Sequence, residues 1–435
     1  KVKSLKKQQQ KVNKDIFKDI NDQDEEWERK ADNILNEIHQ QQQKHAGPYV
    51  DYTRWQYTYP PNVSSFPDEG TYPSLNTLGD ILSQWPQDDL DTPPNPIKET
   101  LAHFDFSDPT QMEMARQLRD AELPFKVYNV PEIDVASEKW TDEYLIDNFD
   151  SDGRARHDGE NNFHPRSGHC QESHDNFFAF YRKNKWIASV MGDGEPPTIE
   201  KPLWSFAKFV KHARYADAVR LPPFATHYYW QSGVPDEEQF RPERAKTFVS
   251  LDLPSFSGKE RSFFIFGEET MASRQPHKGI QCRFGERGVT AATHYDGGRN
   301  MVAMVTGAKR YILAPPKECH KLGIIAHREH PSYRHSMLNF AHLDLLKNDP
   351  SSDGSTGTKE GMPLVELEWL KIAKRSLAVE TVLKKGEVLY IPSHWFHYIT
   401  SLQRSAQCNT RSGKYIKGSI TFGGYDDVRR CVDGA

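Results

Sequence analysis

Cysteine is scarce in this sequence of 435 residues, which has five cysteines spread far apart. No two of them form a Cys-x-x-Cys pair or another spacing typical of a zinc site. The simplest expectation is that all five are reduced thiols, and one or two disulfides remain open if the protein works in an oxidising lumen. The cysteines therefore predict neither a zinc centre nor a disulfide framework.

Long apolar runs and an excess of basic charge are also missing. No apolar run approaches the ~20 residues that a membrane-spanning helix needs. The formal net charge is −5, so we expect no nucleic acid as a partner. The hydrophobic fraction of 36% indicates a soluble chain with long polar connections. Because the sequence starts with Lys1 rather than methionine, we expect native residues upstream of it, and the compartment stays unassigned.

The residue pattern divides the chain into five regions. Residues 1–46 are rich in Lys, Gln and Glu and predict an N-terminal helix, and 47–123 form an extended arm rich in Pro and Asp. Residues 124–260 flank a catalytic core expected over 261–424, and 425–435 form a C-terminal tail. Apolar residues of the predicted N-terminal helix recur at helical spacing and so share one face. They are Ile16, Ile20, Trp27, Ala31, Ile34 and Ile38. This face could bind a partner, bind a second copy of the chain, or lie at a domain edge.

One short motif, His294-Tyr295-Asp296, carries metal chemistry. Side chains two residues apart on a strand point to the same side, so His294 and Asp296 can address a common point. Such a pair alone is weak evidence, because 18 histidines and 61 acidic residues make chance pairs common. A further histidine, His397, closes the run that starts at Gly386. Two histidines and one carboxylate bind one face of an octahedral metal and leave the other face open, as in non-haem Fe(II) oxygenases.

The sequence around these residues predicts β-structure. Residues 301–314 are typical of two strands joined by a turn at Gly307, and Pro315 and Pro316 end the second strand. We therefore predict a mainly β fold with flanking helices, whose core is a double-stranded β-helix, or jelly roll. Strands are expected over 262–267, 280–284, 289–296, 300–306, 309–314, 379–383, 387–391, 397–401, 405–409 and 416–422. Helices are expected over 76–85, 109–122, 140–148 and 203–215.

Together these motifs resemble those of JmjC-domain oxygenases. Within that family the sequence is most similar to the small cupin-like protein hydroxylases, the kind that includes the asparaginyl hydroxylase acting on hypoxia-inducible factor. The similarity starts near Pro124 and ends near Gly423, roughly the last two-thirds of the chain. It implies a cupin-like dioxygenase that uses Fe(II), 2-oxoglutarate and dioxygen to hydroxylate a protein or peptide side chain. It also implies three iron ligands, His294, Asp296 and His397.

The resemblance also implies which residues bind 2-oxoglutarate. Lys309, thirteen residues after Asp296, matches the lysine that pairs with the distal carboxylate. A dianion in a buried barrel needs such a cation, because a bare buried carboxylate is costly. Asn300 and Asn409 match polar residues of the same pocket, and Tyr229 matches a tyrosine whose hydroxyl reaches the same carboxylate. Without the family, these would be a hairpin lysine, two turn or strand-end residues and a core tyrosine.

Two positions depart from the family pattern. Relatives often have a threonine three residues before the first metal histidine, and here that position is Ala291. Thr290 or Thr293 can replace it only if the strand carries a bulge or register shift. Many relatives have an aromatic pair where this chain has Thr410-Arg411. The departures concern the outer pocket and the substrate contacts rather than the metal ligands.

Three other functions stay open. The same chemistry could demethylate an N-methyl-lysine, although no zinc-finger spacing lies beside the barrel. A cupin with another metal would leave Lys309 unexplained, and a non-catalytic scaffold subunit would leave an intact ligand set without a use. Specificity is expected to reside in 124–260 and 320–375, and a polar insert over 348–361 is expected to loop out. The histidines between residues 157 and 174 are interpreted as surface residues rather than a second metal site.

Overall fold

The computed structural model describes residues 49–61, 65–68, 70–150, 169–181, 197–201, 204–234, 248–257, 262–265, 279–343, 364–414 and 422–433. The predicted N-terminal helix and the predicted polar insert lie outside these residues, as do His157 and His164 of the histidine group. None of the helices in the described ranges has the length and apolar character that a membrane span requires.

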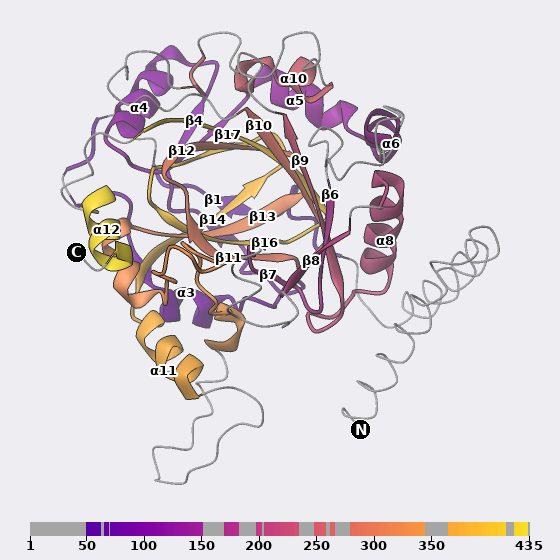
Figure 1. Ribbon diagram of the computed structural model, residues 1–435. Coiled ribbons are helices and arrows are strands. Elements are labelled where there is room, and N and C mark those ends of the chain that lie inside the picture. Colours follow the sequence, from indigo (N-terminus) through magenta and orange to yellow (C-terminus); the bar gives the residue numbers. More distant parts are fainter. Residues whose placement is uncertain are drawn as a thin grey trace.

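Two facing β-sheets form the centre of the molecule (Figure 1). The larger sheet has nine strands in the order β4 (His103–Asp105), β5 (Phe125–Tyr128), β15 (Val388–Ile391), β12 (Gly298–Thr306), β17 (Ser405–Lys414), β10 (Ile280–Gly285), β9 (His227–Val234), β6 (His169–Ser173) and β8 (Thr198–Lys201). The smaller sheet has six strands in the order β2 (Asn76–Thr77), β14 (Leu377–Lys384), β13 (Ala308–Ala314), β16 (Phe396–Ser401), β11 (Thr290–Tyr295) and β7 (Phe177–Phe178). This arrangement confirms the predicted mainly β core with flanking helices.

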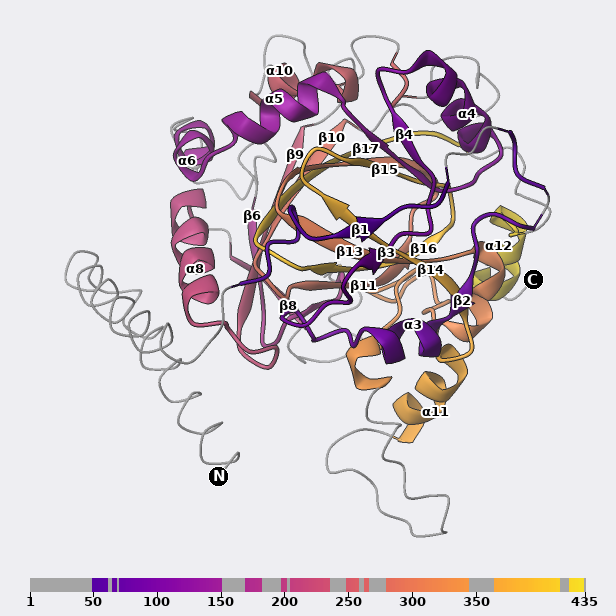
Figure 2. The same cartoon turned by 180° about the vertical axis from the view of Figure 1, so that it is seen from behind.

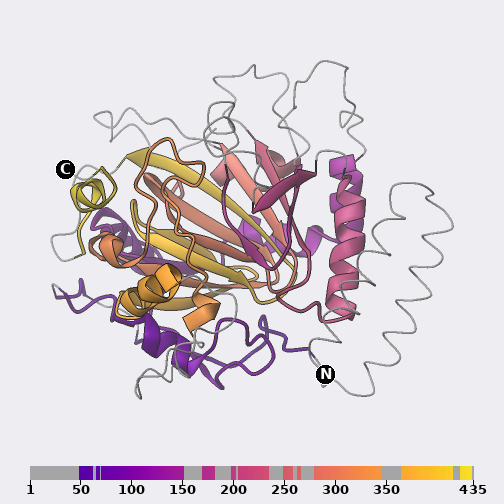
Figure 3. The ribbon, with the colours of Figure 1, turned by 60° about the horizontal axis from the view of Figure 1, so that its bottom comes forward.

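Helices cover the outer faces of both sheets. On the nine-stranded sheet, α4 (Pro109–Asp120) packs on β4 and β5, α5 (Pro131–Lys139) on β12, and α8 (Phe206–Ala218) on β9. Figure 3 shows α8 standing along one side of the sheets, opposite the C-terminal helix. The remaining helices are α3 (Leu78–Gln84), α6 (Asp142–Asp150), α10 (Phe248–Asp252), α11 (Leu364–Ala373) and α12 (Tyr425–Asp433), with short 3-10 turns η3 (Pro254–Phe256) and η5 (Pro316–Lys321).

Strand β10 shows how the alternating sequence sets the two faces of the larger sheet. Ile280, Cys282 and Phe284 are buried in the core that this sheet shares with the helices. Gln281 and Arg283 alternate with them and line or border the space between the sheets. Because side chains two residues apart share a face, one strand serves the apolar core and a polar interior at once.

Most of the predicted elements appear within a few residues of their expected bounds. Of the ten predicted strands, eight correspond to β10–β17. The predicted strand over 262–267 is wrong in its described part, because 262–265 form a turn, and most of 416–422 lies outside the described residues. The predicted helix over 140–148 is α6, and α5 just before it was not predicted. The helices expected over 76–85, 109–122 and 203–215 correspond to α3, α4 and α8.

The arm and the flanking region add strands to both sheets. Strand β5 pairs with β15, β9 pairs with β10, and β2 of the arm pairs with β14. Figure 2 shows the arm crossing the outer face of the smaller sheet, where β1 (Tyr57–Thr58) and β3 (Ile97–Lys98) form a short parallel pair. Tyr52, Trp85 and Ile97 pack there against Ala308 and Val382. The boundary expected at residue 261 stays a prediction.

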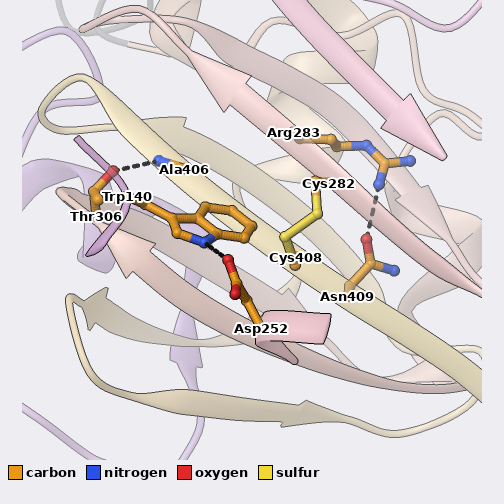
Figure 4. Close-up of a disulfide and its surroundings, with 8 residues drawn as sticks. All are labelled: Trp140, Asp252, Cys282, Arg283, Thr306, Ala406, Cys408 and Asn409. Carbon is orange, nitrogen blue, oxygen red and sulfur yellow. Dashed lines mark hydrogen bonds between the residues drawn. A yellow bond between two sulfur atoms is a disulfide. The ribbon is translucent and has the colours of Figure 1, made fainter. Parts of the chain in front are cut away.

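Four of the five cysteines form two disulfides. Cys282 and Cys408 lie directly opposite each other on β10 and β17, and Cys319 in η5 is bonded to Cys431 in α12 (Figure 4 shows the first). Cys170 is free and buried. The expectation that all five cysteines are reduced is therefore wrong, and the alternative of one or two disulfides is confirmed, with two.

Candidate metal centre

The three predicted iron ligands lie together on the inner face of the smaller sheet. His294 in β11 and His397 in β16 are direct cross-strand neighbours, and Asp296, two residues after His294, directly follows β11. Within the described residues, they are the one group of three or more potential ligand side chains close enough to share a metal, and their ligand atoms lie within 4.8 Å of one another. Strand pairing therefore brings together two motifs that are 103 residues apart.

Hydrogen bonds orient both imidazole rings toward a common point. Nδ1 of His294 lies 2.8 Å from the carbonyl oxygen of Ala292, and Nδ1 of His397 lies 3.2 Å from that of Trp395. A carbonyl oxygen can only accept, so each Nδ1 carries the proton and each Nε2 presents a lone pair. The two Nε2 atoms are 3.0 Å apart, and Nε2 of His397 is 3.9 Å from Oδ2 of Asp296. Two lone pairs and a carboxylate oriented at one point are a donor set that fits a divalent metal.

The protonation states also suit metal binding. Burial, followed by the charge of His397, lowers the pKa of His294 to about 3. Burial likewise lowers the pKa of His397. Burial alone would raise the pKa of Asp296, but Arg411 and then the two histidines hold it well below its usual range. At neutral pH the group therefore consists of two neutral imidazoles and one carboxylate, which are the forms that ligate metals.

A chain of hydrogen bonds from the larger sheet holds the carboxylate. Asn300 donates to Oδ2 of Asp296 at 2.9 Å, Asn409 donates to Asn300 at 3.1 Å, and Arg283 donates to Asn409 at 2.8 Å. Arg411 pairs with Oδ1 of Asp296. Asp296 is thus fixed from both oxygens by residues of three strands, β10, β12 and β17.

These residues line a cavity of about 760 Å³ between the sheets. Of the predicted co-substrate residues, Tyr229, Asn300 and Asn409 line it. Lys309 lies behind the cavity wall with 1% of its surface exposed, and its Nζ is 5.3 Å from the centre of the Tyr229 ring. Its Nζ has neither a hydrogen bond nor an ion pair to any described residue. Burial, followed by the charge of Arg283, lowers the pKa of Lys309 to about 7.

The alanine that departs from the family pattern faces the cavity. The register of β11 against β16 does shift between Ala291 and His294. The shift brings neither nearby threonine into the cavity, because the Thr290 hydroxyl bonds to Thr400 and Thr293 borders a separate small apolar cavity. No nearby threonine therefore takes the place of Ala291 in the cavity wall. The methyl side chain of Ala291 leaves the cavity wider at this point than a threonine would.

Sequence reasoning missed the residue that covers the first metal ligand. The ring of His335 stacks on His294 with centroids 4.9 Å apart, and the ring of Phe180 stacks on His335 at 5.1 Å. His335 belongs to the excursion in which specificity was expected, and residues 328–331 and 333–335 line the cavity. Sequence reasoning noted Arg411 only as a departure and missed Arg283, because neither stands in a recognisable motif.

Comparison with known proteins agrees with the fold. The profile of the cupin-like domain matches residues 110–411, well over half of the chain. The chain therefore belongs to the cupin-like domain family. It shares 30% identity over 122 residues with Jumonji C domain-containing protein 5 of Drosophila melanogaster. It shares 29% over 114 and 122 residues with the lysine-specific demethylases JMJ32 and JMJ30 of Arabidopsis thaliana.

These JmjC relatives are distant and matched only in part. The matches cover 28%, 25% and 28% of this chain and 24%, 32% and 23% of the relatives, in the order given above. The comparisons thus support a cupin-like protein with distant JmjC homologues and a candidate His294, Asp296 and His397 metal site. The finer resemblance to the hydroxylase that acts on hypoxia-inducible factor stays a prediction.

Proposed function

We propose that this protein is an Fe(II)- and 2-oxoglutarate-dependent dioxygenase that hydroxylates a protein or peptide side chain. The observation that carries the proposal is the convergence of two bare imidazole nitrogens and one carboxylate on the wall of the cavity between the sheets. Such a set leaves one face of the metal for other ligands. With 2-oxoglutarate and dioxygen, iron(II) at such a site supplies oxidative decarboxylation to succinate and carbon dioxide coupled to oxidation of a C–H bond.

The residues of the chain have separate tasks in this proposal. His294 and His397 bind the metal through Nε2, and their Nδ1 hydrogen bonds to backbone carbonyls keep the rings from rotating. Asp296 offers Oδ2 to the metal, while Arg411 holds Oδ1. Asn300 keeps the carboxylate in place from the opposite sheet.

Lys309 is the residue that favours 2-oxoglutarate over other small ligands. A buried amine without a partner is costly, and an anion beside it offsets that cost. Tyr229 lies against Lys309, so both can hold the distal carboxylate, while Asn300 and Asn409 line the cavity nearer the metal. Apolar walls from Phe178, Ile391 and Ile399 limit the water in the cavity, which strengthens these charged contacts.

Lysine demethylation is the second candidate, because two of the matched relatives are named lysine-specific demethylases. It uses the same metal ligands and co-substrate and differs in the C–H bond that is oxidised, an N-methyl group in place of a side-chain carbon. Mass spectrometry of modified peptides separates the two, since hydroxylation adds one oxygen atom and demethylation removes a methyl group with release of formaldehyde.

The test adds Fe(II) and 2-oxoglutarate to the purified protein without oxygen and then admits air. We expect a weak visible charge-transfer band in the first step and succinate in the second. The variant His294→Ala should lose both signals, while His320→Ala, which removes an exposed histidine of η5, should keep both. A wild-type protein that binds iron without the band and forms no succinate would instead support a cupin of another kind or a scaffold.

A further inference from the structure

A second cation besides Lys309 borders the cavity, the partly buried Arg283, and the proposed ligands do not yet account for it. Arg283 lies on β10 of the larger sheet, opposite the sheet that carries Lys309 and the metal ligands, and it lines the cavity. Figure 4 shows its guanidinium extending toward Asn409 on the neighbouring strand. Arg283 thus lines the cavity from one sheet, while Lys309 of the other sheet lies behind Tyr229 in the cavity wall.

The contacts of Arg283 distinguish it from the other arginines of the barrel. Arg299, Arg310 and Arg411 each pair with a carboxylate. Within the described residues, Arg283 donates only to neutral amide oxygens, that of Asn409 at 2.8 Å and that of Gln281 at 3.3 Å. A guanidinium inside a protein is stabilised by an anion that accepts two hydrogen bonds side by side. None of the described residues supplies such an anion to Arg283, so a ligand can supply it.

The position of Arg283 indicates which part of a ligand it meets. Hydrogen bonds through Asn409 and Asn300 link Arg283 to Asp296 at the metal end of the cavity. Arg283 also lies opposite Gln231 on β9, two residues from Tyr229, whose ring contacts Lys309. A ligand that extends from the metal toward Lys309 can therefore meet Arg283 in the cavity wall.

We propose that Arg283 and Lys309 form a two-cation clamp for the distal carboxylate of the co-substrate, so that the cavity selects dicarboxylic 2-oxo acids. This inference rests on the proposed function, because it requires that a 2-oxo acid binds at the metal. The clamp is connected to the metal centre through Asn409 and Asn300, which link Arg283 to Asp296.

The disulfide behind the sheet keeps the clamp in register. Cys282 and Cys408 directly precede Arg283 and Asn409 and are bonded on the opposite face of β10 and β17 (Figure 4). The two strands cannot slip past each other while this bond is intact. Arg283 is therefore held in place before the ligand arrives, which reduces the entropy that binding would otherwise cost.

The test compares two 2-oxo acids by calorimetry on Mn(II)-loaded protein under nitrogen. 2-Oxoglutarate has the distal carboxylate, and 2-oxopentanoate has the same chain length with a methyl group in its place. We expect Arg283→Gln to weaken 2-oxoglutarate about tenfold or more and to change 2-oxopentanoate by less than about threefold. Arg283→Lys should recover part of the loss, and Arg116→Gln on the exposed face of α4 should have no effect.

The ratio of the two affinities within one variant is independent of how much of the protein is folded, so poor folding does not obscure the result. Arg283→Gln with an unchanged ratio would overturn the clamp while leaving the proposed function intact. Equal losses of affinity for both acids are one form of this unchanged ratio, and they would show that Arg283 supports the cavity rather than recognises the carboxylate. Wild-type protein that binds neither acid would overturn the proposed function itself, whereas wild-type protein that binds both acids equally would overturn the clamp, because it would show no selection for the distal carboxylate.

Discussion

The burial of Lys309 leads to the prediction that its removal stabilises the ligand-free protein while weakening the co-substrate site. Burial and then Arg283 lower the pKa of this lysine from 10.5 to about 7. A difference of that size corresponds to about 5 kcal/mol between the charged and neutral forms, which we take as an upper bound. Replacement by methionine keeps most of the volume and removes the charge, so we expect Lys309→Met to be more stable than wild type at pH 6.

The pH dependence follows from the direction of the shift. The pKa of Lys309 is lower in the folded state than in the unfolded state, so between about pH 7 and pH 10 the unfolded state binds more protons. The free-energy cost of burying the charged Lys309 amine in wild type is therefore full below pH 7 and decreases as the pH rises toward 10.5. The stability difference between Lys309→Met and wild type should be largest near pH 6 and small near pH 10.

Urea unfolding from pH 6 to pH 10 measures this difference, with Lys371→Met on the exposed face of α11 as the control. Saturating 2-oxoglutarate and metal should raise the stability of wild type more than that of Lys309→Met, because a ligand stabilises the state that it binds. If Lys309→Met is less stable than wild type at pH 6 and the difference does not change with pH, the lysine has a partner in the ligand-free protein and the argument fails.

Two further predictions concern the surroundings of the site. Replacing both Cys282 and Cys408 by serine should lower the free energy of unfolding by about 2–4 kcal/mol in urea denaturation, and an unchanged value would show that the bond does not restrict the unfolded chain. Replacing Arg411 by leucine should raise the pKa of Asp296, because Arg411 is the strongest influence that lowers it. Mn(II) affinity measured by calorimetry should then decline at a higher pH than in wild type as the solution is acidified, and two superimposable pH profiles would contradict this.

Much of the barrel could be predicted because its strands carry local signals. The strands around His294 have apolar stretches, a turn at Gly307 and two prolines that end β13, and all of these act within a few residues. The His294 and Asp296 pair could be assigned to one side of a strand by the same local rule. Only the meeting of these residues with His397 needed the family pattern, since it depends on pairing between distant strands.

What could not be predicted depends on contacts between distant segments. No local pattern indicates that β9 and β6 extend the larger sheet beside β10, or that Cys282 faces Cys408 across a strand pair. Register also determines that Arg411 pairs with Asp296 and that Arg283 bonds to amide oxygens rather than to a carboxylate of the described residues. The sequence therefore predicts the donor residues better than the charges that surround them.

The packing of the arm on the smaller sheet has a practical consequence for expressing the protein. The family profile begins at residue 110, so a shortened version cut there would lack β2, α3 and the aromatic side chains of Tyr52 and Trp85. The edge of β14 would lose its partner strand, and Arg310 would lose the carbonyl of Trp85 as an acceptor. Bare strand edges and uncovered apolar surface promote aggregation. Recombinant versions should therefore begin upstream of Tyr52.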